Sequence, residues 1–495
     1  MKIRTAADLM GAQGSQLSAE LFDKEIVGFS IDSRTTGAGE LFFALSQADY
    51  ARAGFNGTFA DAHRFIPQAL RCGALAAVAR RDHVEGDHEL RAVSDRLLLV
   101  EDAIAALQTL AHRVYESWAR PVVAITGSAG KTTAKELTAH LLSASGRRVL
   151  KSERNYNNGL GLPLAVLQMV TEGRKPEEFD LAVLEMGMSS PTHEIARLCR
   201  ITPPDIGVEL LVAPVHLEHL GTIENIAAAK AELIEGLKPG ATAVLNADDE
   251  RVIAMRGLHD GPVVTFGLEN ESDVTATEID TRRLGRSRFR LRTPLGQAEA
   301  MLPMPGRHNL MNALAAAAVA TCFEIAPEEI ARALRSVTPA KMRGEVIDFA
   351  AGFTVVDDSY NSNPRSLLSI VRAVAEGAAS GARRRVVVAG EMLELGPEGE
   401  RMHREAGAEI ARSGVDLLWG VRGLAQAIVE GAQAAGMSHD AARFFETSEQ
   451  AAAAICDEVR EGDLVLVKGS RGVETDKVVK ALRDRFPALG GDEED

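Results

Sequence analysis

The amino-acid sequence predicts an α/β protein of three domains, in which parallel β-sheets are covered by helices. Short, continuous apolar runs alternate along the chain with segments whose apolar residues recur at helical spacing. This alternation is typical of strands that are buried on both faces of a parallel sheet. The chain has 495 residues, which is enough for about three domains of ordinary size.

The predicted strands can be located along the chain. Each is an apolar run, rich in β-branched residues, that precedes a turn and a helical pattern. They are VVAIT (122–126), LAVLE (181–185), TAVLN (242–246), FTVV (353–356), RVVVAG (385–390) and LVLVKG (464–469). Between residues 262 and 300, segments such as SRFRLRTPLG alternate polar and apolar residues, which predicts inserted antiparallel strands.

Two breaks divide the chain. A helical stretch ends before Arg120 and Pro121, and a new series of strands and helices begins after Thr338 and Pro339. We therefore expect domains at residues 1–118, 119–338 and 339–495.

Charge and composition argue against several classes of protein. Lys and Arg number 55 against 70 Asp and Glu, and the net charge of −15 argues against general binding to nucleic acid or a membrane surface. The apolar run Leu310–Phe323 is too short to span a bilayer, and the N-terminus lacks the apolar stretch of a signal peptide. The four cysteines lie far apart in the sequence, so we expect them to be buried thiols in the reduced form. We expect a cytoplasmic protein.

A glycine-rich turn follows the strand VVAIT and precedes a helical pattern. It consists of Gly127, Ser128, Ala129, Gly130, Lys131, Thr132 and Thr133. Such a turn forms an anion cradle, because backbone N–H groups and the helix dipole both favour phosphate oxygens. Lys131 would reach the outer phosphates, and the Thr132 hydroxyl would bind Mg²⁺. Since Ile125 stands where the usual GxxxxGK[ST] pattern has its first glycine, an ordinary turn with a surface lysine is the alternative.

Three further residues of the central region are candidates for a metal site. Glu185 ends LAVLE, His216 follows an apolar segment, and Lys230 lies in a predicted helix. Open α/β sheets bind ligands at the carboxyl ends of their strands, and a carboxylate there suits Mg²⁺. Imidazole prefers softer metals, and a helical lysine is usually solvated. Taken singly, each of these residues fits a structural role better than a metal site.

Longer motifs extend over nearly the whole chain. They are IDSRTTGAGELFFAL (31–45), TGSAGKTTAKE (126–136), NYNNGLGLPLAVL (155–167), LEMGMSSPTHEI (184–195), APVHLEHLG (213–221), AAAKAEL (227–233), GRHNLMNALAA (306–316), MRGEV (342–346), VVDDSYNSNPRSL (355–367), VAGEMLELG (388–396) and LVKGSR (466–471). In these residues and in this order, the chain resembles the Mur ligases of peptidoglycan synthesis.

The resemblance implies roles for individual residues. Lys131, Glu185, His216 and Lys230 would form the catalytic set, and Thr132 would join the last three as a metal ligand. Lys230 would carry a carbamate, which turns the lysine into an oxygen ligand. The other implied contacts are His308, Asn309 and Asn312 at the adenine, Arg343, Asp358, Tyr360 and Asn363 in a third domain that closes on ATP, Asn157 and Asn158 near the sugar nucleotide, and Ser33 and Arg34 at its uridine end.

The resemblance also implies an architecture and a reaction. Residues 1–118 would bind the UDP substrate, 119–338 would form a phosphate-loop ATPase domain, and 339–495 a Rossmann-like ligase domain. The motifs GSAGKTT and DDSYNSNP are most similar to those of members which use ATP and Mg²⁺ to join D-Ala-D-Ala to UDP-N-acetylmuramoyl-tripeptide. Such an enzyme is expected to be a cytoplasmic monomer. The alternatives are another Mur ligase specificity, a folylpolyglutamate-synthase-like ligase, and a sensor that binds a sugar nucleotide without forming a bond.

Three stretches depart from the family pattern. Leu210 and Leu211 stand where Thr-Asn is frequent, and His193 stands where glycine is common. Residues 61–65 read DAHRF where Asp-Gly-His-Asp-Phe is expected. The resemblance therefore leaves the geometry of the sugar-nucleotide pocket open.

Overall fold

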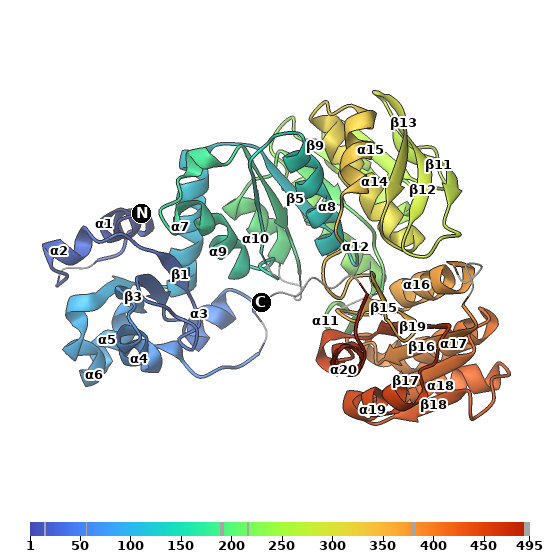
Figure 1. Cartoon of the computed structure of the whole chain (residues 1–495). Helices are drawn as coiled ribbons and strands as arrows, with labels where there is room; N and C mark the ends of the chain where they lie inside the picture. The colour runs from blue at the N-terminus through green and yellow to red at the C-terminus, as the bar shows by residue number, and fades with distance from the viewer. Residues whose placement is uncertain are drawn as a thin grey trace.

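The computed structural model describes residues 1–13, 16–55, 57–153, 155–188, 193–214, 217–377 and 382–489. These residues form three sheets, which follow one another along the chain and across the molecule (Figure 1). Each sheet has apolar cores on both faces, so the predicted three-domain α/β fold is confirmed. In this part of the chain, no helix is both long and apolar enough to cross a membrane.

The first sheet is parallel, with the strand order β1-β2-β3-β4. Its strands are β1 (Gly28–Ser30), β2 (Glu40–Phe43), β3 (Ala76–Arg80) and β4 (Leu97–Val100). The helices around it are α1 (Ile3–Met10), α2 (Ala19–Phe22), α3 (Gln47–Arg52), α4 (Ile66–Arg71), α5 (Arg81–Gly86), α6 (His88–Ala92) and α7 (Ala103–Trp118). The apolar face of α7 belongs to a core that the first and second sheets share.

The second sheet has the order β13-β12-β11-β10-β9-β8-β5-β7-β6. Its strands are β5 (Val122–Thr126), β6 (Val149–Lys151), β7 (Leu181–Glu185), β8 (Ile206–Glu209), β9 (Thr242–Asn246), β10 (Val263–Gly267), β11 (Val274–Asp280), β12 (Ser287–Thr293) and β13 (Gly296–Leu302). The antiparallel strands predicted between residues 262 and 300 are β11 to β13, whereas β10 still pairs in parallel with both of its neighbours.

Helices cover both faces of the second sheet (Figure 1). One face carries α8 (Lys131–Ala144), α14 (Arg307–Cys322) and α15 (Pro327–Arg335). The other carries α7, α9 (Gly161–Leu167), α10 (Glu194–Ile201) and α12 (Ile223–Glu235). The short helices α11 (Leu217–Leu220) and α13 (Glu250–Ala254) follow β8 and β9. Because β5 is buried along its whole length, its continuous apolar run is the pattern that this position requires.

The third sheet has the order β14-β15-β19-β16-β17-β18, and only the edge strand β14 is antiparallel. Its strands are β14 (Glu345–Asp348), β15 (Thr354–Asp358), β16 (Arg384–Gly390), β17 (Leu417–Val421), β18 (Ala442–Phe445) and β19 (Asp463–Lys468). Its helices are α16 (Pro364–Gly377), α17 (Gly399–Arg412) and α18 (Ala425–Ala434) on one face, and α19 (Ser448–Glu458) and α20 (Asp476–Arg485) on the other.

Candidate active site

The glycine-rich turn joins the end of β5 to the start of α8. Gly130 precedes the helix with φ of 82°, a left-handed conformation that favours glycine. A Cβ atom at this residue would collide with the side chain of Asn312. No side chain among the described residues caps the N-terminus of α8, so its first N–H groups are available to an anion.

Lys131 and Thr132 begin α8 and lie beside a buried carboxylate. The Lys131 ammonium donates to the carbonyl of Gly127 at 2.8 Å, and burial lowers its pKa, a shift that Glu185 opposes. The Thr132 hydroxyl donates to Oε2 of Glu185 at 2.8 Å, and Nδ2 of Asn157 donates to Oε1 at 2.8 Å. A hydroxyl and a carboxylate oxygen this close form a hard-oxygen donor pair that fits Mg²⁺.

Lys230 lies behind the phosphate loop, where only 1% of the residue is exposed. Its ammonium donates to the hydroxyl of Thr126 at 3.1 Å. Burial lowers the pKa of Lys230 to about 7, and neighbouring Lys131 adds to the shift. The pair Thr126 and Glu209 is in register between β5 and β8, which places a second buried acid beside this lysine.

A cavity of about 770 Å³ joins the second domain to the third. From the second domain it is lined by the phosphate loop, Glu185, Asn157, Asn158, His308, Asn309 and Asn312. From the third domain it is lined by Arg343, Asp358, Tyr360, Asn363 and Lys468. The structure therefore brings together most of the residues that the sequence singled out, although they come from distant parts of the chain.

The predicted adenine-side residues begin α14. Nδ1 of His308 lies 3.0 Å from the hydroxyl of Ser369 in α16, so this contact crosses from the second domain to the third. Burial lowers the pKa of His308 to about 4, which leaves the ring neutral near pH 7. Asn309 donates to the carbonyl of Pro305 at 2.8 Å, and Asn312 packs against Gly130 of the phosphate loop.

The predicted third-domain residues face the phosphate loop. The Arg343 guanidinium donates to the Thr132 hydroxyl at 3.1 Å and lies 4.0 Å from the ring centre of Tyr360. The carboxamide oxygen of Asn363 accepts from the backbone N–H of Ser366 at 2.9 Å, so it caps the first turn of α16. Arg343 thus places a third-domain cation beside the Thr132 hydroxyl at the start of α8.

Among the predicted residues that the structure describes, four do not line this cavity: Ser33, Arg34, Gly127 and Lys230. Ser33 and Arg34 follow β1 in the first domain, outside its lining, and Arg34 is paired with Asp32. His216 lies outside the described residues. Asn158 lines the cavity, but its side-chain oxygen accepts from the N–H groups of Leu160 and Gly161 at the start of α9.

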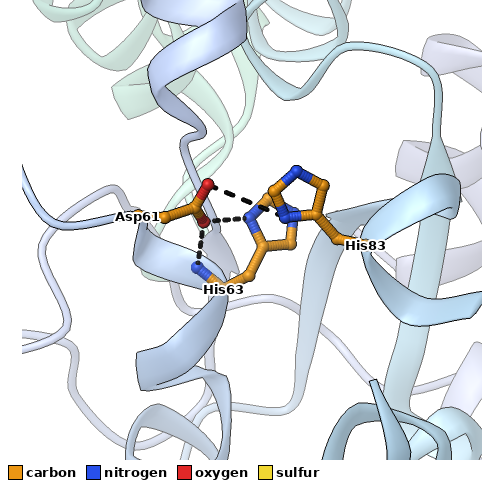
Figure 2. A group of neighbouring side chains, drawn as sticks. All are labelled: Asp61, His63 and His83. Atoms are coloured by element: carbon orange, nitrogen blue, oxygen red, sulfur yellow. Dashed lines mark hydrogen bonds and ion pairs between the residues drawn. The ribbon is translucent and has the colours of Figure 1, made fainter. Parts of the chain in front are cut away.

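Residues 61–65 depart from the family pattern, and two of them, Asp61 and His63, form a separate cluster with His83 (Figure 2). Asp61 accepts from Nδ1 of His63 at 2.7 Å, and Nε2 of His63 accepts from the backbone N–H of Arg80 at 2.9 Å. Burial lowers the pKa of His63, so the ring is neutral with its proton on Nδ1. Because both ring nitrogens are engaged, His63 has no lone pair for a metal ion, and the cluster instead ties β3 to the 3₁₀ helix at 62–65.

Two further residues were not assigned a role from the sequence, although Lys468 stands in the motif LVKGSR. Glu209 ends β8 and is fully buried, and neither carboxylate oxygen has a hydrogen-bond partner among the described residues. Lys468 ends β19 and lines the cavity. Both stand at the carboxyl ends of parallel strands, which is the same signal that marked Glu185.

Known proteins resemble this chain over nearly its whole length. A family model described as the Mur ligase middle domain matches residues 125–320, and the Mur ligase, glutamate ligase domain matches residues 342–471. The UDP-N-acetylmuramoyl-tripeptide–D-alanyl-D-alanine ligase of Bacillus subtilis is 31% identical, with 97% of this chain and 98% of that protein covered. The Escherichia coli protein of the same name is 33% identical, with 94% and 96% covered.

Solved structures show the same likeness. The crystal structure of MurF from Acinetobacter baumannii has a TM-score of 0.82 at 27% identity, with 98% of each chain covered. MurF ligase from Thermotoga maritima in complex with ADP has a TM-score of 0.76 at 27% identity, with 95% of this chain and 99% of that chain covered. With these matches over nearly its full length, the chain belongs to the Mur ligase family.

Proposed function

We propose that this chain is an ATP-dependent ligase that joins D-alanyl-D-alanine to UDP-N-acetylmuramoyl-tripeptide. The observation that carries the proposal is a cavity lined both by the phosphate loop and by the ends of β15 and β19. Such a cavity can hold a nucleotide between two domains and keep water from a reactive intermediate. The near-full-length similarity to ligases of this name supports the choice of substrates.

The reaction would proceed in two steps. The terminal carboxylate of the tripeptide attacks the γ-phosphorus of ATP, which gives an acyl phosphate and ADP. The neutral amine of D-Ala-D-Ala then attacks the acyl carbon, phosphate leaves, and the amine proton is released. The first step brings two anions together, so the protein must offset their repulsion.

Cations from two domains would meet this requirement. Lys131 and the N-terminus of α8 would hold the outer phosphates from the second domain. Arg343, which reaches the Thr132 hydroxyl, would add positive charge from the third domain at the same point. His308, Asn309 and Asn312 would support the adenine side, and Ser33 and Arg34 the uridine end of the other substrate.

The metal site would be built on Thr132 and Glu185, whose oxygens lie 2.8 Å apart. His216 and a carbamate on Lys230 would complete it. The pKa of about 7 leaves much of the Lys230 amine uncharged near neutral pH, which is the form that reacts with carbon dioxide. Mg²⁺ held there would offset the charge of the transferred phosphoryl group.

One assay separates this proposal from its rivals. ADP release is measured with pairs of carboxylate and amine substrates, with Lys131→Ala as the negative control. We expect release only when UDP-N-acetylmuramoyl-tripeptide and D-Ala-D-Ala are both present. Release with a shorter UDP-peptide and a single amino acid would identify another Mur ligase specificity. Release with a folate and glutamate would identify a folylpolyglutamate-type ligase, and no release with any pair would indicate a sensor.

A further inference from the structure

A segment of the first domain reaches across to the second domain. It comprises the described residues 47–55 and 57–59, begins with α3, and follows the end of β2. Because β1 and β2 are parallel neighbours, this segment leaves the first sheet at the same edge as Ser33 and Arg34, which follow β1. Open α/β sheets bind ligands at this edge, where the carboxyl ends of their strands lie. The segment therefore starts at the predicted uridine end of the substrate site.

The start of the segment is fixed to the first domain. Asp49 in α3 is fully buried, and it accepts from the Arg80 guanidinium at 2.5 Å and from the backbone N–H of Ala103 at 3.0 Å. Arg52, also in α3, donates to Asp102 at 2.6 Å. These contacts tie α3 to the end of β3 and to the start of α7.

The residues after α3 lie against the second domain. A Cβ atom added to Gly159 would lie 2.8 Å from Cζ of Phe55, so this ring packs directly on the glycine. The guanidinium carbon of Arg197 in α10 lies 5.8 Å from the centre of the Phe55 ring, and the same side chain donates to the carbonyl of Ala53. The ring centre of Tyr50 lies 4.9 Å from that of Phe55. Phe55 is therefore held between the two domains.

Gly159 belongs to a loop, residues 155–160, that lines the cavity of the candidate active site. Asn157 and Asn158 line this cavity, and Asn157 donates to Glu185 at 2.8 Å. Phe55 does not line the cavity and contacts the loop from outside it. One aromatic ring thus connects the carboxyl edge of the first sheet to the loop that carries both asparagines.

We propose that Phe55 is a positioning residue for the UDP substrate, which holds the loop at 155–160 at a fixed distance from the carboxyl edge of the first sheet. The substrate spans from its uridine end at this edge to its reacting carboxylate in the cavity. The two ends bind together only if the two parts of the site are correctly spaced. The proposal rests on the proposed function in one respect, which is that a UDP-linked substrate spans both domains.

The test compares three ligands on the whole protein, after thermal melting has shown which variants fold. Binding of UDP-N-acetylmuramoyl-tripeptide and of ATP with magnesium is measured by calorimetry, and binding of UDP by ligand-observed NMR. We expect Phe55→Ala to weaken binding of the UDP-tripeptide by about tenfold or more, because the loop loses its support. UDP contacts only the first-domain edge, and ATP lies between the second and third domains, so both should bind within about threefold of wild type.

Two further variants test the contact itself. Phe55→Met keeps an apolar side chain against Gly159 and should bind the UDP-tripeptide within about threefold of wild type. Gly159→Ala adds a methyl group where the Phe55 ring lies, so it should weaken the same binding by about threefold or more. In the double variant Phe55→Ala with Gly159→Ala the methyl group has room, so its binding should be no weaker than that of Phe55→Ala.

Phe22→Ala is the matched control. It removes an aromatic ring of the first domain that packs with the Arg4 guanidinium in α1 at 5.2 Å, and it should leave all three affinities unchanged.

Three results would overturn the proposal. Equal loss of UDP and UDP-tripeptide binding in Phe55→Ala would make Phe55 a structural support of the first domain. Unchanged UDP-tripeptide binding in Phe55→Ala would show that the contact positions nothing. A double variant weakened by the product of the two single effects would show that Phe55 and Gly159 act separately. Wild type that binds ATP but not the UDP-tripeptide would contradict the proposed function, and this proposal with it.

Discussion

Glu209 and Lys230 are buried behind the phosphate loop, and burial moves their pKa values toward each other. It raises the pKa of Glu209 to about 8, although Lys230 opposes the shift. It lowers the pKa of Lys230 to about 7. Both groups can therefore be uncharged near neutral pH, which avoids two isolated charges in a region that water does not reach.

Replacing Glu209 with Gln should make stability less dependent on pH. The ordinary pKa of this carboxyl group is 4.5, and its folded-state value is raised to about 8. Between these values the unfolded chain binds fewer protons than the folded protein, so wild-type stability falls as the pH rises. We compare the melting temperature of Glu209→Gln with that of wild type at each pH. We expect the value for the variant minus the value for wild type to be higher at pH 8 than at pH 5 by about 2 °C or more.

The measurement is calorimetric melting across this pH range. Glu250→Gln, on the surface of α13, is the control and should melt in parallel with wild type. A difference between Glu209→Gln and wild type that stays constant with pH would show that Glu209 is ionised in the folded protein.

Residues that belong to a local motif could be predicted, and residues whose role depends on strand neighbours could not. Lys131 and Thr132 stand in a glycine-rich turn, and that pattern alone indicates phosphate binding. Glu209 also ends a strand, but a single acid there is common. Its position beside the phosphate loop appears only when β8 lies beside β5, and no local pattern specifies this pairing.

At the scale of elements, α8 is bounded by two glycines in the same backbone conformation. Gly130 precedes the helix with φ of 82°, and Gly146 follows it with φ of 87°. A Cβ at Gly130 would meet Asn312, whereas a Cβ at Gly146 would meet nothing within 4 Å. The two positions therefore separate the cost of the left-handed backbone from the cost of filling the phosphate cradle.

Gly146→Ala should lower the free energy of unfolding by roughly 1–2 kcal/mol and leave ATP binding intact. Gly130→Ala should cost at least as much stability and also weaken ATP binding by about tenfold or more, because Asn312 and the loop must move apart. Chemical denaturation and calorimetric ATP binding measure the two effects. Equal ATP affinity in both variants would mean that the turn before α8 does not hold the phosphates.

The strands themselves follow closely from the sequence. VVAIT, LAVLE and TAVLN correspond residue for residue to β5, β7 and β9, because each run is buried on both faces of a parallel sheet. The strand order does not follow from these runs. β5 lies between β8 and β7, an arrangement that depends on how the helices pack on the two faces.

At the scale of the whole molecule, the three domains are joined in different ways. The first and second share one apolar core through α7. Polar contacts that join the third domain to the second include Arg343 with Thr132, His308 with Ser369, and Arg365 with Asp249 at 3.8 Å. Contacts of this kind contribute little each, so the third domain is suited to open and close around a nucleotide.

The collinear motifs predicted three domains, but they did not predict which residues form the contacts between the domains. The hairpin loop after β11 places Leu284 against the core of the third domain, and Gly285 lies beside Val346. Nothing in the local sequence of this loop indicates a contact with a domain that begins about fifty residues later. The shared cavity is therefore a property of the assembled molecule.

We expect amide formation to pass through an acyl phosphate in that shared cavity, and oxygen labelling tests this expectation most directly. UDP-N-acetylmuramoyl-tripeptide is labelled with ¹⁸O in both oxygens of its terminal carboxylate, and the phosphate released with D-Ala-D-Ala and ATP is analysed by mass spectrometry. Because the carboxylate oxygen that attacks phosphorus leaves with it, we expect one ¹⁸O atom in each released phosphate. Phosphate without the label, formed together with the amide, would contradict the mechanism.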